Sequence, residues 1–269
     1  MPRSSRRAKS QQRNNLLLGA LALLLVIGIL SGALWWWSQK NNNSLDAQTL
    51  CPTSGALGHN VLLIDATDPL NMAQKAALDL YLSDLAIKNT PAGYLLSVFV
   101  LGHDFKADTQ PLVQLCNPGT AQGHSAMTEN IQQLTRRYQE GFLKPVLEQT
   151  QQLTGRESAE ESPIFEMLQM LSLNSLQKQQ VDGPKTLVVV SDLLQNSPQF
   201  SMYQTTPNFE QFTKTAYATK TKINFDGVDV KVLVLFNSPA LQKTTLFDFW
   251  KQYFKSAGAR SVQIDLLPG

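Results

Sequence analysis

Short apolar runs alternate with amphipathic stretches along most of the chain. The runs at 61–65 (VLLID) and 186–191 (TLVVVS) are almost wholly apolar, which is typical of strands buried on both faces. Over 71–87, apolar residues recur near helical spacing. The same criteria predict strands at 94–101, 111–116, 228–236 and 261–267, and helices at 127–153, 162–176 and 244–256. Alternating β and α segments of this length predict a parallel sheet with helices on both faces.

Three prolines and a serine refine this pattern. Pro111 opens the strand at 111–116, and because proline is tolerated at a sheet edge, we expect an antiparallel edge strand there. Pro145 predicts a kink in the helix at 127–153. Ser162 and Pro163 suit the cap and first turn of the next helix. The predicted fold class is therefore α/β, a doubly wound, mostly parallel sheet with one antiparallel edge strand.

The chain begins with a basic head and a long apolar segment. Residues 16–37 (LLLGALALLLVIGILSGALWWW) carry no charge, and 22 residues suffice for a helix across a hydrocarbon core of roughly 30 Å. Five cations precede this segment and only Lys40 follows closely, which predicts a cytoplasmic N-terminus. The alternative is a cleaved signal peptide, with small residues at 31–33 as its cleavage site. The length of the apolar run and its three terminal tryptophans favour an uncleaved anchor.

These features predict four parts. They are a cytoplasmic head (1–15), a transmembrane helix (16–37), a polar linker (38–57) and a domain at 58–269 in the periplasm or outside the cell. The part beyond the span holds all 21 acidic residues and 18 of the 23 Lys and Arg, a net charge of −3, and it lacks a basic stripe. We therefore expect no nucleic-acid binding. Gly28 and Gly32 have the spacing of a helix-dimer contact, so a homo-oligomer is open.

The chain has two cysteines, Cys51 and Cys116, both on the predicted extracytoplasmic side. An even pair in an oxidising compartment favours one disulfide, which would tie the linker to the domain. The alternative is two independent buried thiols.

Two predicted strands end in an acid. Asp65 closes the run VLLID, and Asp192 follows TLVVVS at once. In a doubly wound sheet, ligands collect beyond the carboxyl ends of the strands. Carboxylate and hydroxyl oxygens at such an edge suit a hard cation, Mg²⁺ or another divalent ion.

The placement of Asp65-Ala66-Thr67, Ser162-Pro163-Ile164 and Ser191-Asp192 resembles a von Willebrand factor type A (vWA) domain. That family carries a metal-ion-dependent adhesion site with the pattern Asp-x-Ser/Thr-x-Ser, a later Thr and a second Asp. The resemblance implies metal ligands at Asp65, Thr67, Ser162 and Asp192. Pro69 departs from the pattern, because it stands where the family has its second Ser and offers no side-chain oxygen. Asp68 is the candidate substitute, directly or through water.

A metal-free reading of the same residues stays open. Asp65 and Asp192 can cap loop amides, Asp68 can cap the following helix, and Ser162 can cap its own helix. The site is then a degenerate adhesion site without an ion.

The loop at 195–209 is unusually long for a compact domain. It carries Phe200, Met202 and Tyr203, residue types that suit partner surfaces. We take these three as partner-binding candidates. The alternative is that they pin the loop to the domain.

No catalytic constellation is apparent, so the sequence favours a binding protein over an enzyme. The resemblance implies a protein-binding domain whose cation would accept an acidic residue of the partner. The predicted anchor, together with a binding fold that lacks catalytic groups, leads us to expect a docking or assembly subunit of an envelope complex. Two alternatives are a divalent-metal hydrolase using Asp65 and Asp192, and a metal-free structural anchor. The sequence does not identify the partner or the process.

Overall fold

A computed structural model describes residues 19, 21–35, 37, 44–102, 109–122, 130–151, 159–179, 181–204 and 208–268. The chain divides into two units, Met1–Ser44 and Leu45–Gly269, called units 1 and 2 below. In unit 1, residues 21–35 are helical. No helix formed by the described residues combines the length and the hydropathy that crossing a bilayer needs. Residues 16–18, 20 and 36 of the predicted span lie outside the described residues, and the anchor stays a prediction.

Unit 2 is built on a six-stranded sheet with the order β3-β2-β1-β4-β7-β8. All neighbouring strands are parallel except β2 and β3, which are antiparallel. The predicted sheet with one antiparallel edge strand is therefore confirmed. The strands are β1 (Gly58–Asp65), β2 (Tyr94–Leu101), β3 (Val113–Cys116), β4 (Lys185–Ser191), β7 (Val228–Val234) and β8 (Ser261–Leu266).

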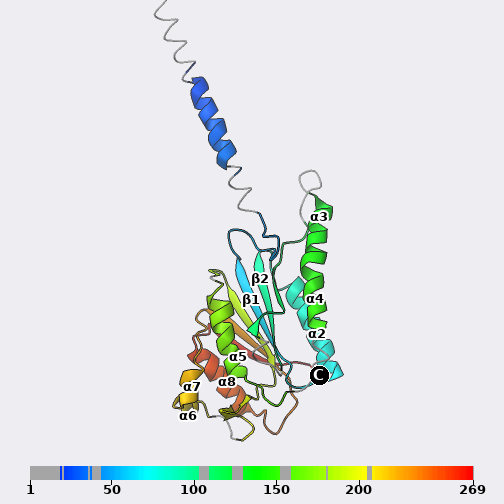
Figure 1. Ribbon diagram of the computed structural model, residues 1–269, viewed down its shortest axis with the longest axis vertical. Helices are drawn as coiled ribbons and strands as arrows, with labels where there is room; N and C mark the ends of the chain where they lie inside the picture. Colours follow the sequence, from blue (N-terminus) through cyan, green and yellow to red (C-terminus); the bar gives the residue numbers. More distant parts are fainter. Residues whose placement is uncertain are drawn as a thin grey trace, which may run out of the picture. The chain divides into compact units, whose positions relative to one another are not determined.

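Helices cover both faces of the sheet, as the alternating pattern predicted (Figure 1). Val61 and Leu63 of β1 belong to one apolar core and Leu62 and Ile64 to another, because successive side chains of a strand alternate between its faces. The first core includes side chains of α5 (Ile164–Leu171), α6 (Phe209–Thr213), α7 (Ala216–Lys220) and α8 (Thr244–Ser256). The second includes side chains of α2 (Met72–Ile87), the π-helix η2 (Arg137–Leu143) and α4 (Lys144–Gln151).

Two of the predicted helices contain π-helical segments that the sequence pattern did not indicate. The helix expected at 127–153 is α3 (Ile131–Arg136), then η2, then α4, and Pro145 lies in the first turn of α4. Residues 127–129, 152 and 153 lie outside the described residues. The helix expected at 162–176 is α5 followed by the π-helix η4 (Ser172–Gln177). Widened turns of this kind are rare and are frequent at functional sites.

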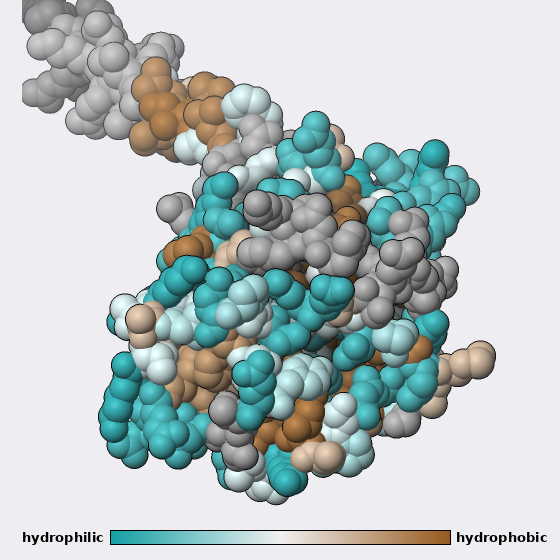
Figure 2. Space-filling view, turned by 60° about the horizontal axis from the view of Figure 1, so that its bottom comes forward, coloured by the Kyte–Doolittle hydropathy of each residue, from teal (hydrophilic) through white to brown (hydrophobic). Residues whose placement is uncertain are grey.

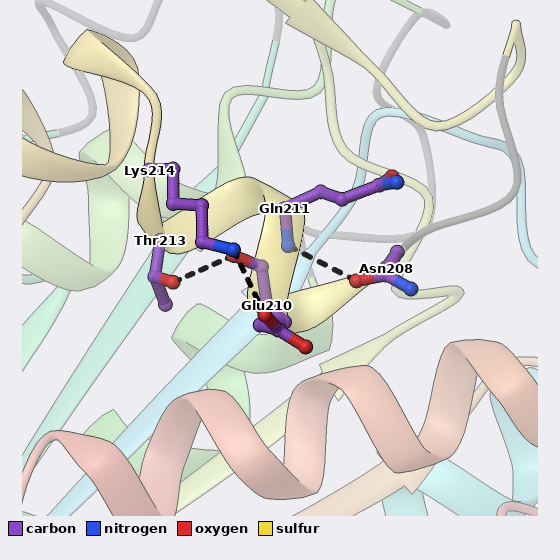
Figure 3. A network of polar contacts seen from close by, with 5 residues as sticks. All are labelled: Asn208, Glu210, Gln211, Thr213 and Lys214. Carbon is purple, nitrogen blue, oxygen red and sulfur yellow. Dashed lines mark hydrogen bonds and ion pairs between the residues drawn. The ribbon is translucent and has the colours of Figure 1, made fainter.

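The short helix α6 contributes to the first core from the loop region after β4. Its N-cap, Asn208, accepts a hydrogen bond from the Gln211 N–H at 3.0 Å, and Lys214 pairs with Glu210 at 2.8 Å (Figure 3). These polar contacts lie along the exposed side of α6, while Phe212 is buried and stacks on Phe165 of α5. A five-residue helix is thereby held against the aromatic core.

The linker is joined to the sheet by the predicted disulfide. Cys51 and Cys116 are bonded, which confirms the pairing, and the bridge closes a sequence separation of 65 residues. The N–H of Cys116 also donates to the Thr49 carbonyl at 2.8 Å. The chain before β1 is thus held against the edge strand β3.

His59 gives the fold a predictable pH dependence. The side chain is fully buried, and burial, followed by the charge of Lys185, lowers the pKa of His59 to about 4. The unfolded chain protonates this imidazole near pH 6.5. Between pH 6.5 and 4 the unfolded state therefore binds more protons than the folded state, and stability falls as the pH drops.

We expect His59→Gln to remove about 2–3 kcal/mol of that acid-induced loss. The measurement is the free energy of unfolding in urea at several pH values from 7 to 4, for both proteins. Parallel curves for the two proteins would contradict the assignment, because the other titrating groups are common to both.

Candidate functional site

β1 and β4 are neighbours at the point where the chain stops adding strands on one side of β1 and begins to add them on the other. Three predicted site segments converge at the carboxyl ends of these two strands. Asp65 is the last residue of β1, and Ser191 the last of β4. The Ser191 hydroxyl donates to Asp65 Oδ2 at 2.7 Å, and the Ser162 hydroxyl donates to the same oxygen at 3.2 Å. All three residues are buried. This is the switch point of a doubly wound sheet, where ligands of such folds bind.

The other oxygen of Asp65 is also engaged. Thr67 donates to Asp65 Oδ1 twice, from its hydroxyl at 2.6 Å and from its backbone N–H at 3.1 Å. One buried carboxylate therefore accepts four hydrogen bonds from three segments. The hydroxyl oxygens of Thr67 and Ser162 are both fixed at its two sides.

Asp192 directly follows β4 and begins a constrained turn. Its Oδ1 accepts the N–H of Leu194 at 2.9 Å, and its carbonyl accepts Gln242 Nε2 at 2.9 Å. Leu193 is fully buried with φ of 65°, and its carbonyl accepts the Trp250 indole N–H at 2.9 Å. A left-handed, non-glycine residue is costly and persists where its surroundings determine it, often at functional sites.

No cationic side chain in the described part of the chain pairs with Asp65 or Asp192, so the negative charge of their ionised forms is disfavoured. Burial raises the pKa of Asp65 in spite of its four hydrogen bonds. Burial, then the charge of Asp65, then that of Asp68 raise the pKa of Asp192 to about 8. The ion pairs formed among the described residues include none of these three acids. A bound cation or a proton would relieve this charge.

Tyr203 and Asp68 form the exposed rim of the site. The side chain of Tyr203 is 46% exposed, and Asp68 is half-buried. Burial raises the pKa of the Tyr203 phenol, and the charges of Asp192, Asp68 and Asp65 raise it further, which places the ring near all three acids. We call Asp65, Asp68, Asp192 and Tyr203 the acidic rim.

The other two partner-binding candidates face inward. The loop forms a small hairpin, β5 (Asn196–Ser197) and β6 (Phe200–Ser201). Met202 is buried, and Phe200 packs edge-on against Phe165 at 5.9 Å between ring centroids. For these two residues the structure shows the alternative, a loop pinned to the domain, and Tyr203 is the exposed member of the three.

Ser162 has a different role from the cap that the sequence suggested. Pro163 occupies the N-cap position of α5, and no side chain caps that helix. Ser162 instead pairs with Asn196 through two backbone hydrogen bonds of 2.8 and 2.9 Å, and its hydroxyl turns to Asp65. The β5–β6 hairpin thus positions Ser162. A local sequence rule could not anticipate this contact between distant segments.

The donor set suits a hard divalent ion in its chemistry. Hydroxyl oxygens of Thr67 and Ser162 and carboxylate oxygens of Asp65 and Asp192 come from three segments of the chain. Mg²⁺ prefers oxygen ligands, several of them water. Pro69 adds no oxygen. Among the residues that the structure describes, no three His, Cys, Asp or Glu side chains are grouped closely enough to hold a metal. Hydroxyls and water would therefore complete any coordination shell.

Sequence reasoning left Ser191 out of the site residues, although it donates one of the shortest hydrogen bonds to Asp65. The parallel register pairs Ile64 with Val190, so the next residues, Asp65 and Ser191, face the same side. The signal was therefore present once β1 and β4 were assumed to be neighbours. Gln242, which reaches the Asp192 carbonyl from the loop before α8, had no such signal.

Replacing Asp65 by asparagine should lower the free energy of unfolding by about 1–3 kcal/mol. The amide group places a donor where hydroxyls of Thr67, Ser162 or Ser191 now donate, so buried donors lose their acceptor. Urea unfolding without divalent ions measures the change. The exposed Asp182→Asn is the matched control, and equal losses in the two variants would contradict this account.

Comparison with known proteins gives fold likeness only. No family model and no curated protein matches the chain. Among solved structures, the VWA domain of SpRpn10 matches at 15% identity and a TM-score of 0.39, covering 79% of this chain and 89% of that one. An aerotolerance-related membrane protein from Bacteroides fragilis matches at 9% and 0.38, covering 77% and 91%. The manganese-loaded TRAP protein of Plasmodium vivax matches at 11% and 0.35, covering 70% and 61%.

At these values the matches say nothing of binding or activity. Unit 2 itself has the antiparallel edge strand β3 and the acids at the ends of β1 and β4 that the sequence led us to expect.

Proposed function

We propose that unit 2 is a protein-docking module that binds its partner at the acidic rim. The observation that carries the proposal is the convergence of Asp65, Ser162 and Ser191 at the switch point, beside the strained turn of Asp192. A pre-formed polar site that exposes an aromatic ring suits recognition of another protein.

The surface supports a polar contact rather than a broad apolar one. The face turned forward in Figure 2 is largely hydrophilic, with hydrophobic residues in small separate areas. Elsewhere in unit 2, exposed large apolar side chains include Met72 and Leu80 on α2, Leu173 on η4, and Phe236 and Leu266, which line one hollow. The acidic rim differs from these positions because it carries ionisable groups, which favour specific recognition.

We propose further that a divalent cation binds at this site. The ion would be held, directly or through water, by Thr67, Ser162, Asp192 and Asp65. The charge of Asp68 acts on Asp192 and would strengthen the attraction of the site for the cation. Bound there, the ion would supply a positive centre for an acidic partner residue. The chain's own contribution is to fix the hydroxyls of Thr67 and Ser162 on Asp65 before any ligand arrives.

The wider setting is proposed from the sequence. Residues 16–37 would anchor the protein by a single span, with the N-terminus cytoplasmic and unit 2 in the periplasm or outside the cell, as a docking subunit of an envelope complex. Attachment of a reporter to Gly269 tests this topology. Activity of a reporter that works only in the cytosol would contradict it.

The metal step is tested by titrating the full chain in nanodiscs with Mg²⁺, Mn²⁺ and Ca²⁺. We expect one of these ions to raise the melting temperature of the wild type in a saturable way and to release measurable heat. Asp192→Asn should lose most of the effect, whereas the exposed Asp182→Asn should keep it. If all three proteins respond alike, the ion binds elsewhere.

Partner docking is tested separately with a photocrosslinking residue in place of Tyr203, in native membranes. We expect a discrete crosslinked protein that disappears when Asp192→Asn is added. The same residue in place of Leu173, which is 55% exposed on η4, is the control. Equal crosslinking from both positions, or no dependence on Asp192, would reject the acidic rim as the docking site.

A further inference from the structure

A polar pocket lies away from the acidic rim, beside the edge strand β3. Its volume is about 200 Å³, and its lining includes Phe99, Gln110, Gln114, Asn174, Lys178 and Gln179. The pocket shares no residue with the acidic rim. Side-chain amides form much of the wall, Lys178 supplies a positive charge, and no carboxylate is among the lining residues.

A chain of polar contacts leads from this pocket into the protein. Gln114 Nε2 donates to the Ser97 hydroxyl at 3.4 Å, and that hydroxyl contacts His59 Nε2 at 2.9 Å. The register pairs Ser97 with both Val61 and Gln114, so these contacts cross from β3 through β2 to β1. His59 is fully buried and, with its pKa lowered to about 4, is neutral at physiological pH.

Two buried atoms close to this wall lack a hydrogen-bond partner. They are His59 Nδ1 and the hydroxyl of Ser175, the neighbour in sequence of the lining residue Asn174. Native proteins leave few such groups unpaired, and each one calls for a physical explanation. Neither residue lines the pocket itself: His59 lies on β1, and Ser175 lies on the π-helix η4 beside the lining residue Asn174.

The π-helix shapes the wall. η4 continues α5, and its turn leaves Ser175 buried while the adjacent Asn174 is exposed and lines the pocket with Lys178, just after η4. Strained or widened helical turns of this kind are often kept because a site needs them. The π-helical turn and the polar wall are thus two observations at one place, and the contacts through Gln114 and Ser97 connect that place to His59.

We propose that this pocket binds a small oxyanion, a carboxylate or a phosphate, whose charge is paired by Lys178 and whose other oxygens are bound by the amides of Gln114 and Asn174. A pocket that holds one cation and several amides, with no acid, attracts an anion able to accept several hydrogen bonds. Its volume equals that of about seven molecules of liquid water, which fits a small metabolite and not a drug-sized ligand.

Binding is transmitted to His59 through Gln114 and Ser97. When Gln114 turns its amide toward the ligand, the Ser97 hydroxyl changes its hydrogen bonding to His59 Nε2. The imidazole therefore reports occupancy of the pocket without touching the ligand. This proposal is independent of the docking function proposed for the acidic rim.

The test uses the full chain in zwitterionic nanodiscs, with isotope-labelled histidine and the His59 signals assigned from His59→Gln. We expect saturable shifts of the His59 ring nitrogens on titration with inorganic phosphate or malate, but not with sodium chloride at the same ionic strength. Whichever anion gives the tighter binding identifies the class. Shifts that sodium chloride reproduces, or no shifts with either anion, would overturn the proposal.

Variants separate binding from its transmission. Lys178→Gln should weaken binding about tenfold or more, the effect of one lost charge-assisted contact, whereas Lys255→Gln on the exposed end of α8 should not. Gln114→Leu should reduce the His59 shift more than it reduces the heat of binding. If the two lysine variants bind equally, the pocket does not hold the anion. Circular dichroism of each variant verifies that it is folded.

Discussion

Replacing Phe165 by alanine is expected to lower the free energy of unfolding by about 3–5 kcal/mol. Phe165 is fully buried in α5 and stacks on Trp250 with ring centroids 4.7 Å apart. Its other ring neighbours are Phe200, Phe212, Tyr217, Phe249 and Tyr253, with centroids 4.8–6.1 Å away. Truncation therefore opens a cavity where α5, α6, α7, α8 and the β5–β6 hairpin meet.

The same substitution should also weaken the acidic rim. Phe165 follows Ser162 by three residues, and its N–H donates to Gln195 Oε1 at 2.9 Å. Chemical unfolding measures the stability, and the calorimetric titration described above measures cation binding. Phe236→Ala, at a side chain 40% exposed, is the control and should cost far less. A loss in Phe165→Ala no larger than in the control would show that the aromatic core is not closely packed.

Removal of the Cys51–Cys116 disulfide is the second large effect, about 4 kcal/mol for a closed loop of this length in the chain-entropy model. The change is the double substitution Cys51→Ser and Cys116→Ser, compared with the wild type by urea unfolding. The bridge encloses the segment that forms β1, α2, β2 and β3. Its loss removes a constraint on this segment in the unfolded chain and so raises the conformational entropy of the unfolded state.

A reducing agent provides the matched control. It should lower the stability of the wild type to that of the double variant and leave the variant unchanged. A further loss in the reduced variant would reveal an effect of the reagent itself. No difference between oxidised and reduced wild type would contradict the assignment of a stabilising bridge.

The strands of the main sheet could be largely predicted because their signals are local and strong. The runs at 61–65 and 94–101 are buried on both faces, so their composition alone marks them, and β2 has the predicted bounds. α8 likewise begins and ends as predicted. These elements need no information from distant parts of the chain.

The elements that were missed depend on distant contacts. Residues 195–201 have no strand pattern, yet they form β5 and β6, held in part by the pairing of Ser162 with Asn196. The π-helical segments η2 and η4 also could not be predicted from the spacing of apolar residues, because an extra residue in one helical turn changes no local preference. The transmembrane helix predicted at 16–37 belongs to unit 1 and stays a prediction.

For the candidate site, the structure brings the predicted polar residues together at one edge of the sheet, and their function stays a prediction. Asp65, Thr67 and Ser162 share hydrogen bonds, and Asp192 interacts electrostatically with Asp65, as their positions at strand and loop ends implied. Whether a loop side chain would be exposed or buried was harder to predict than the position of the loop. Phe200 and Met202 looked like surface residues because aromatic and thioether side chains in a long loop serve equally as core.

The bond between the linker and β3 determines how the domain would respond to mechanical pulling. Tension on the chain upstream of Cys51 passes through the sulfur bridge to the end of β3, at the edge of the sheet. Without the bridge, the same tension would reach Gly58 first and peel β1 from between β2 and β4. A protein pulled at its amino end thus keeps its central strand, and the carboxylate at the end of that strand, out of the path of force.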